Sequence, residues 1–313
     1  MAAQIQVTDY KHPGGYTSAV DAARRAREYC RQLEEGAILF LDSIPYPLPQ
    51  DDVEFLLEQR QGASRFHKNI SYRPKSDLLR GTADEDPQGA RRLHEIMRNF
   101  SNQVMRFVDS FLAPYATDRQ LDYASYRPIE EKGRDLSCHK RNDLMHVDAF
   151  PTRPTNGGRI LRVFTNINPT ANRVWEVSEP FEPLAGKLAG PAGLDRFAKY
   201  ARSPMRKVRQ TVAPLLRPLG MRTLDRSPYD QFMLHFHDWL KENAEYQKNW
   251  PKTRLEFPPR STWLVYTDTV PHSVLSGQFA LEQTFIVPMS AMVVPQKTPL
   301  KILESLCGIG LAN

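Results

Sequence analysis

KRNDLMHVDAFP, residues 140–151, places His146 and Asp148 two positions apart. On an extended strand, residues i and i+2 point to the same face, so the imidazole and the carboxylate are directed at one point while Val147 turns into the packing. With a second histidine from a distant strand, they would form the two-histidine, one-carboxylate face that holds Fe(II) and leaves positions open for substrate and oxygen. A His-x-Asp triplet alone is a weak motif, so the surrounding sequence has to support it.

Strands are predicted on both sides of this triplet. The run RILRVFTNIN at 159–168 is rich in branched and aromatic residues, which is typical of a strand. Its alternate residues give one apolar face and one face that bears Arg162 and two amides, as expected if a buried site lies on one side of the strand. Further strands are predicted at 123–129, 172–182, 261–268, 271–277 and 278–287.

Three histidines are candidates for the remaining metal ligand. His272 is preferred, because it stands near the start of the strand and turn predicted over 271–277. His235 and His237 lie on a helix that is predicted to start at Ser227-Pro228. Two residues apart on a helix, their side chains point about 200° apart, so they cannot both bind one metal from that helix. Either one is an alternative to His272.

Helices are predicted mainly in the N-terminal part, at 17–35, 52–60 and 87–113, with a short buried strand at 37–41. The helix at 87–113 has apolar residues at three- and four-residue spacings, which is typical of a face packed in a core. Residues 64–81 are basic and irregular, and this segment is either a loop that binds an anion or a solvated loop. A short amphipathic helix is predicted near the C-terminus.

Composition limits the possible classes of protein. The chain has 313 residues, 41% of them hydrophobic, which suffices for one large core with a helical annex. A net charge of +6 suggests an anionic substrate or surface, but no aromatic-basic repeat indicates nucleic-acid binding. Three widely spaced cysteines give no disulfide framework or zinc pair and fit a reducing cytoplasm. No signal peptide and no apolar run of about 20 residues is apparent.

A basic insertion is predicted at 195–250, where helices interrupt the strands. Between residues 196 and 222 it has eight Lys and Arg and no acid, together with apolar residues. This combination suits a peripheral contact with an anionic bilayer. The alternative is a solvated insertion that packs on the rest of the domain.

The sequence resembles a known family at the motifs HVDAF, GRILRVFTNINP and TDTVPHSVLSGQFALEQTF. They are similar to those of the Kdo 3-hydroxylases, Fe(II)- and 2-oxoglutarate-dependent dioxygenases of Gram-negative bacteria. Kdo is 3-deoxy-D-manno-oct-2-ulosonic acid, a sugar of the lipopolysaccharide inner core. The resemblance implies a mostly β, α+β fold: a double-stranded β-helix (a jelly-roll, cupin-like barrel) flanked by helices. It places the iron ligands at His146, Asp148 and His272.

The arginine that binds 2-oxoglutarate departs from the common superfamily pattern. Many members have it about ten residues after the distal histidine, where this chain has Glu282, with Thr284 two residues further on. Some relatives place the cation on the strand after His-x-Asp, and Arg162 fits that placement. The alternative interpretation is that Arg162 forms a structural pair with Glu282 across the barrel.

The resemblance implies O2-dependent hydroxylation of C3 of Kdo in Kdo-lipid A, in the cytoplasm and peripherally on the inner membrane. We expect a single domain, 1–313, with a mainly helical part at 1–115, barrel strands at 120–182 and 261–290, and the insertion at 195–250. Alternatives are the same chemistry on another anionic sugar or small acid, and a non-catalytic metal-binding jelly-roll protein.

Overall fold

A large, mostly antiparallel sheet forms the centre of the computed structural model, which describes residues 1–12, 14–62, 69–83, 86–203 and 226–312. Within these residues the sheet has the strand order β1-β4-β11-β8-β13-β7-β5-β6, in which only β1 and β4 pair in parallel. The strands in that order are β1 (Gln4–Gln6), β4 (Ile38–Leu41), β11 (Thr262–Tyr266), β8 (Arg159–Asn166), β13 (Ala280–Val287), β7 (Gln120–Arg127), β5 (Ile70–Arg73) and β6 (Leu78–Arg80).

A smaller antiparallel sheet faces the first. Its strands, in spatial order, are β10 (Thr253–Phe257), β9 (Arg173–Val177) and β12 (His272–Ser276). Aromatic side chains fill the space between the two sheets, with the rings of Phe257 and Trp263 stacked at 4.0 Å and Trp175 edge-on to Trp263. Because both inner faces are apolar there, burial of these rings holds the sheets together. A further short hairpin joins β2 (Tyr10–Lys11) and β3 (Gly15–Tyr16).

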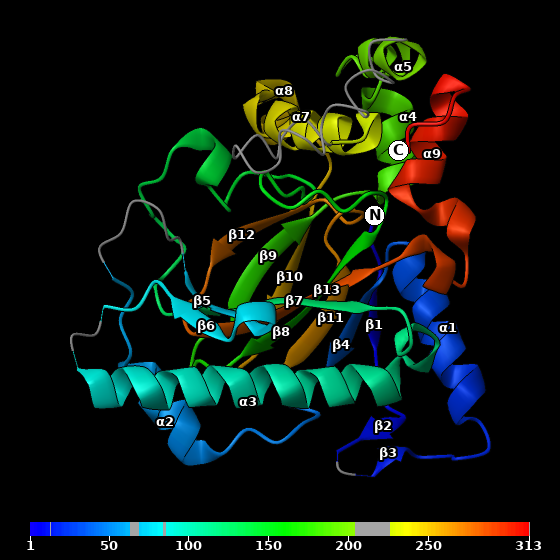
Figure 1. The fold of residues 1–313 in the computed structure, drawn as a ribbon. Coiled ribbons are helices and arrows are strands. Elements are labelled where there is room, and N and C mark those ends of the chain that lie inside the picture. The colour runs from blue at the N-terminus through cyan, green and yellow to red at the C-terminus, as the bar shows by residue number, and fades with distance from the viewer. Residues whose placement is uncertain (13, 63–68, 84–85, 204–225, 313) are drawn as a thin grey trace.

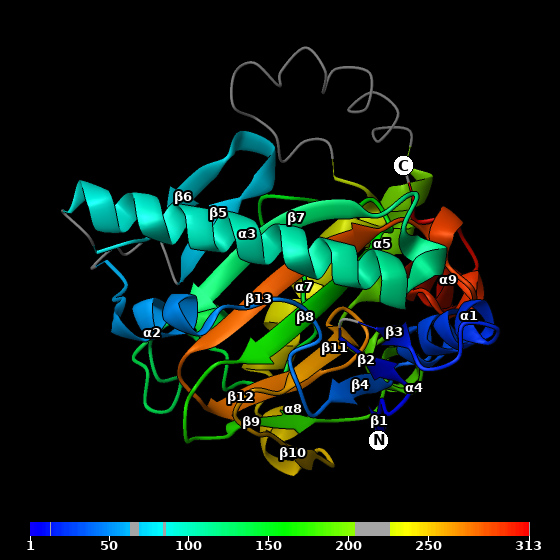
Figure 2. The ribbon, with the colours of Figure 1, turned by 90° about the horizontal axis from the view of Figure 1, so that it is seen from below.

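The N-terminal helices α1 (Ala22–Glu34), α2 (Gln50–Glu58) and α3 (Pro87–Phe111) belong to the core on the outer face of the large sheet. Helix α3 runs along that face in Figures 1 and 2. It starts at Pro87, where the side chain of Asp86 accepts hydrogen bonds from the backbone N–H of Gln88 and Gly89. Its buried residues, including Leu93, recur at helical spacing as the sequence predicts.

A second group of helices gathers on the opposite side of the molecule, above the sheets in Figure 1. These helices share one apolar cluster, to which Met145 and Val147 also belong. They are α4 (Phe181–Leu188), α5 (Leu194–Arg202), α7 (Pro228–Glu242), α8 (Ala244–Asn249) and α9 (Pro299–Cys307). Val147 therefore anchors the His-x-Asp segment to this cluster, while its two neighbours face the other way. Within the described ranges, no helix is both long and apolar enough to cross a bilayer.

Two segments differ from the secondary structure predicted for them. The basic stretch at 64–81 includes a hairpin, β5 and β6, which extends the large sheet through pairing of β5 with β7. The strand predicted over 172–182 ends at Val177, and α4 starts at Phe181 after Pro180. Both differences depend on long-range pairing and packing, which local composition does not specify. Of the basic stretch at 196–222, residues 204–222 lie outside the described residues.

Candidate metal and co-substrate site

Backbone pairing brings His146, Asp148 and His272 to one face. His146 and His272 are directly opposite each other in an antiparallel bridge. The backbone nitrogen of His146 is 3.1 Å from the carbonyl oxygen of His272, and the backbone nitrogen of His272 is 2.9 Å from the carbonyl oxygen of His146. Directly opposed residues of an antiparallel pair project to the same side, and Asp148 follows at i+2. The backbone N–H of Asp148 donates to the carbonyl of Thr267 at 2.8 Å, and its Oδ1 lies 3.7 Å from His146 Nε2.

The two strand-borne histidines have the same hydrogen-bond arrangement. His146 Nδ1 is 2.6 Å from the carbonyl oxygen of Leu144, and His272 Nδ1 is 2.9 Å from that of Val270. A carbonyl accepts only from a protonated nitrogen, so both rings carry their proton on Nδ1 and keep the Nε2 lone pair for a ligand. The rings of the two histidines are 4.8 Å apart, and Trp175 stacks on His272 at 5.1 Å.

A third imidazole, that of His237 on α7, reaches the same place from the opposite side. In the described part of the chain, His146, Asp148 and His237 form the one group of three potential ligands whose donor atoms all lie within 4.8 Å of one another. His237 Nδ1 is 2.8 Å from the carbonyl oxygen of Val147. His235 points elsewhere, because its Nε2 is 2.9 Å from the carbonyl oxygen of Ala192 and its ring packs on Phe197.

Charges around these side chains favour a neutral-imidazole, anionic-carboxylate set. Burial lowers the pKa of His146 well below its usual range, and the cation of Lys241 adds to this effect. Burial also lowers the pKa of His272, and it lowers that of His237 to about 4. Burial alone would raise the pKa of Asp148, but the cation of Arg162 opposes it, and the net shift is downward.

A chain of alternating charges continues from Asp148 across the inner face of the large sheet. Arg162 Nη2 is 3.1 Å from Asp148 Oδ2, and its Nη1 is 2.8 Å from Glu282 Oε1. Glu282 also accepts from Arg127, whose Nη1 is 3.5 Å from Glu131. The register explains the contact, because Glu282 on β13 is opposite Phe164 on β8 and so is the diagonal neighbour of Arg162 on the same face.

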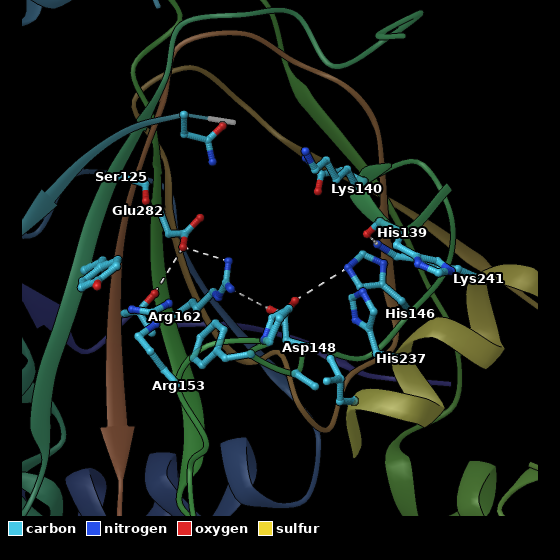
Figure 3. Close-up of a pocket in the computed structure, with 18 of the residues that line it drawn as sticks. Ser125, His139, Lys140, His146, Asp148, Arg153, Arg162, His237, Lys241 and Glu282 are labelled. Carbon is cyan, nitrogen blue, oxygen red and sulfur yellow. Dashed lines mark hydrogen bonds and ion pairs between the residues drawn. The ribbon is translucent and has the colours of Figure 1, made fainter. Parts of the chain in front are cut away.

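A cavity of about 580 Å³ opens in front of these groups. In Figure 3, Arg162, Arg153 and Glu282 lie on one side of it and His139, Lys140 and Lys241 on the other, with Asp148, His146 and His237 between them. His272 does not line this cavity. The cavity therefore has two cationic walls, one built on strands and one on α7 and the loop that precedes His146.

These residues fit a divalent metal ion. His146 and His272 offer Nε2 lone pairs, and Asp148 is an anion at neutral pH. Asp148 Oδ2 is buried and accepts no hydrogen bond, although it lies beside Arg162, so it has a lone pair for a metal. Two imidazoles and one carboxylate are the donor set of non-haem Fe(II) oxygenases.

The sequence pattern did not identify every residue of this site. Lys241 follows His237 by four residues, so a helical count from His237 would have placed it on the same face of α7. Arg127 lies within the strand predicted at 123–129 and is the last residue of β7, and its link to Glu282 depends on the pairing of β7 with β13. No local motif gives that pairing.

Comparisons with known proteins identify the family of this chain. A family model for 3-deoxy-D-manno-oct-2-ulosonic acid (Kdo) hydroxylases matches residues 17–309. A search of curated proteins found no match.

Several solved structures of the Kdo hydroxylase KdoO, described as a non-haem Fe(II) alpha-ketoglutarate-dependent dioxygenase, are similar to this chain over its whole length. One contains alpha-ketoglutarate and Fe(III), with a TM-score of 0.81. A second contains cobalt(II), with a TM-score of 0.83, and a third contains succinate and Fe(III), with a TM-score of 0.80. Each is 33% identical to this chain, and the match covers 99% of this chain and 97% of the other.

Proposed function

The chain belongs to the Kdo hydroxylase family, and we propose that it hydroxylates C3 of a Kdo residue in Kdo-lipid A. It is an Fe(II)- and 2-oxoglutarate-dependent dioxygenase that uses O2 and yields succinate and CO2. The observation that supports this most strongly is 33% identity with KdoO across 99% of the chain. The lipid-linked acceptor and the position on the sugar are our proposal.

We propose further that the two sheets form a double-stranded β-helix. The chain alternates between them: β7 lies in the large sheet, the His146 bridge beside the small one, β8 in the large one, β9 and β10 in the small one. It then returns to β11, crosses to β12 and ends on β13. Such alternation of antiparallel strands between two facing sheets is the jelly-roll pattern.

For the iron we propose the ligands His146, Asp148 and His272. A facial triad has its protein ligands on one side and leaves the other side open for co-substrate and oxygen. His272 fits the protein side, because it lies on the strand that bridges to His146 and keeps its Nε2 lone pair for a ligand. His237 comes from α7 on the opposite side and would occupy the open side, although its donor atom is one of the three that all lie within 4.8 Å of one another. We therefore assign it to the substrate side.

Iron held there supplies the oxidising chemistry that couples loss of CO2 from 2-oxoglutarate to hydroxylation of a C–H bond. The residues of this chain bind and orient the two organic substrates. We propose that Arg162 binds the far carboxylate of 2-oxoglutarate. In support, its guanidinium lines the cavity beside Asp148 and its Nε is buried without a hydrogen-bond partner. Arg153 is the other cation of that wall, but Asp122 accepts two of its hydrogen bonds at 2.6 and 2.7 Å.

We propose that the enzyme works in the cytoplasm, at the surface of the inner membrane, because a lipid-linked Kdo is held there. The basic stretch at 196–222 supports this, since each Lys or Arg near an anionic bilayer contributes about 1 kcal/mol. Replacing Arg202, Arg206, Lys207 and Arg209 with Gln should move the protein from the membrane fraction to the soluble fraction at low salt. An unchanged distribution would exclude a docking role for this stretch.

The function is tested by incubating the purified protein with Fe(II), 2-oxoglutarate and a Kdo-lipid A acceptor. We expect succinate release that depends on the acceptor, and a mass gain of one oxygen atom on Kdo, located at C3 by fragmentation. Oxygen added to a different carbon would correct the position. Succinate without any modified sugar would contradict the proposed acceptor, and other anionic sugars should then be tested.

A further inference from the structure

Lys241 occupies an unusual environment on the wall of the cavity opposite Arg162 (Figure 3). It is only 4% exposed, and its Nζ donates to the carbonyl oxygen of His139 at 2.9 Å. In the part of the chain that the structure describes, it forms no ion pair with a carboxylate, although buried lysines are normally paired. Because an ammonium group has three N–H donors, the bond to His139 leaves donors for a ligand in the cavity.

The acidic side chains of α7 near Lys241 are directed at histidines. Asp238 Oδ1 lies 3.9 Å from His139 Nδ1 and 3.9 Å from His237 Nε2, and Glu242 Oε1 lies 2.6 Å from His139 Nε2. Asp148, Asp238 and Asp143 act on Lys241 only across longer distances. Burial lowers the pKa of Lys241 to about 8, so most molecules still have the ammonium form at neutral pH.

The opposite wall differs in its charge balance. Arg162 and Arg127 share one carboxylate, that of Glu282, and Arg162 also contacts Asp148, the carboxylate that we assign to the metal. Lys241 has a carbonyl instead. A buried cation without an anionic partner favours binding of an anion from outside the protein.

The chemistry of the reaction requires a second anion site of this kind. 2-Oxoglutarate and the sugar acid are bound at the same time, and both are carboxylates. In a 3-deoxy-2-ulosonic acid the carboxylate is attached to C2, which is next to C3. When C3 is placed at the metal, the carboxylate of the sugar therefore also lies inside the cavity and needs its own cation.

We propose that Lys241 binds the C1 carboxylate of the sugar acid and so positions C3 toward the metal ligands. This assignment rests on the proposed function. The two walls then divide the two acids between them, with the strand-borne arginine on the side of 2-oxoglutarate and the helix-borne lysine on the side of the sugar. Lys241 is thereby a residue that determines specificity for an acidic sugar.

The test uses two variants, Lys241→Met, which removes the charge but keeps a long side chain, and Lys241→Arg. For each variant we would measure the binding of Kdo and the turnover of Kdo conjugates. Calorimetry with protein loaded with cobalt(II) and 2-oxoglutarate gives the Kd for free Kdo without turnover. We expect Lys241→Met to raise this Kd about 10–100-fold, as for a lost hydrogen bond to a charged group, and Lys241→Arg to raise it less. The KM for 2-oxoglutarate should stay at the wild-type value in both.

An acceptor that lacks the carboxylate charge separates loss of the contact with Lys241 from a general disturbance of the site. The methyl ester of the Kdo acceptor should be a poor substrate of the wild type, and Lys241→Met should not make it poorer. An equal loss on acid and ester would overturn the assignment, and so would a raised KM for 2-oxoglutarate. The effect must also persist with an acceptor that lacks the lipid A phosphates, because its disappearance would assign Lys241 to a phosphate.

Lys187→Met is the control, since Lys187 is 58% exposed in its side chain, pairs with Glu179 and lies outside the cavity. Failure of the proposed function is distinguishable from failure of this inference. In the first case the wild type does not hydroxylate Kdo at all. In the second it does, and Lys241→Met binds Kdo as tightly as the wild type.

Discussion

The two walls of the cavity hold their functional side chains in different ways. On the strand side, Arg162 and Glu282 meet because the register of β8 and β13 places them diagonally on one face. On the helix side, His237 and Lys241 reach the cavity because α7 packs by its apolar face against the cluster that includes Val147. A register error of one residue would turn every side chain of a strand to the other face, whereas a helix can shift by smaller steps. The strand wall is therefore the more rigid support. The metal ligands that we propose lie beside it, where Asp148 contacts Arg162, and they are also held by strand pairing, through the antiparallel bridge between His146 and His272.

The largest effect should come from breaking the strand wall at its anionic ligand. We expect Asp148→Ala to abolish turnover and to weaken cobalt(II) binding by more than about 100-fold, beyond what loss of an outer contact costs. Calorimetric metal titration of the folded variant measures this directly. Turnover that survives in Asp148→Ala would mean that the metal lies elsewhere.

The sharpest comparison between the walls is His272→Ala against His237→Ala. If the strand wall holds the metal, His272→Ala should lose cobalt(II) binding as Asp148→Ala does. His237→Ala should weaken cobalt(II) binding by no more than about 100-fold, as for a group near the metal that does not bind it. The reverse result would move the third ligand to α7, and His235→Ala serves as a control because His235 points away.

A smaller effect is expected from the cation of the strand wall. Arg162→Ala should make the binding free energy of 2-oxoglutarate less favourable by about 2–5 kcal/mol, which is typical of a buried charge pair that loses one partner. Arg162→Lys should restore it only in part, because the bidentate fork is lost. Titration of 2-oxoglutarate against succinate release measures both. If Arg162→Ala responds to 2-oxoglutarate as the wild type does, Arg162 is a structural partner of Glu282, and Arg153→Ala should then be tested.

The smallest effect should come from loosening the helix wall at its start. Ser227 caps α7 by accepting from the backbone N–H of Asp230 at 3.0 Å. Ser227→Ala should lower the free energy of unfolding by about 1 kcal/mol, as for other lost caps. Cobalt(II) and 2-oxoglutarate binding should stay at wild-type values, because the strand wall is untouched. Denaturant unfolding and metal titration together check this, and weakened metal binding would show that the two walls are coupled.

Features of this protein that depend on neighbouring residues were readable from the sequence. The i, i+2 spacing of His146 and Asp148 predicts a shared face, and alternation in 159–168 predicts that Arg162 belongs to the polar side. The long apolar stripe predicts helix α3 and its buried face. These features depend on the periodicity of one element, which is encoded locally.

Features that join distant elements were decided by the tertiary structure. The bridge between His146 and His272, the shared face of Arg162 and Glu282, and the approach of α7 each join segments more than 80 residues apart in sequence. The sequence made His272 the preferred third ligand and His237 an alternative, but no local pattern indicated that both would lie beside His146, or that Lys241 would be buried in the same cavity. Pairing and packing between distant segments depend on the sum of many weak contacts across the whole core, so no single stretch of sequence specifies them.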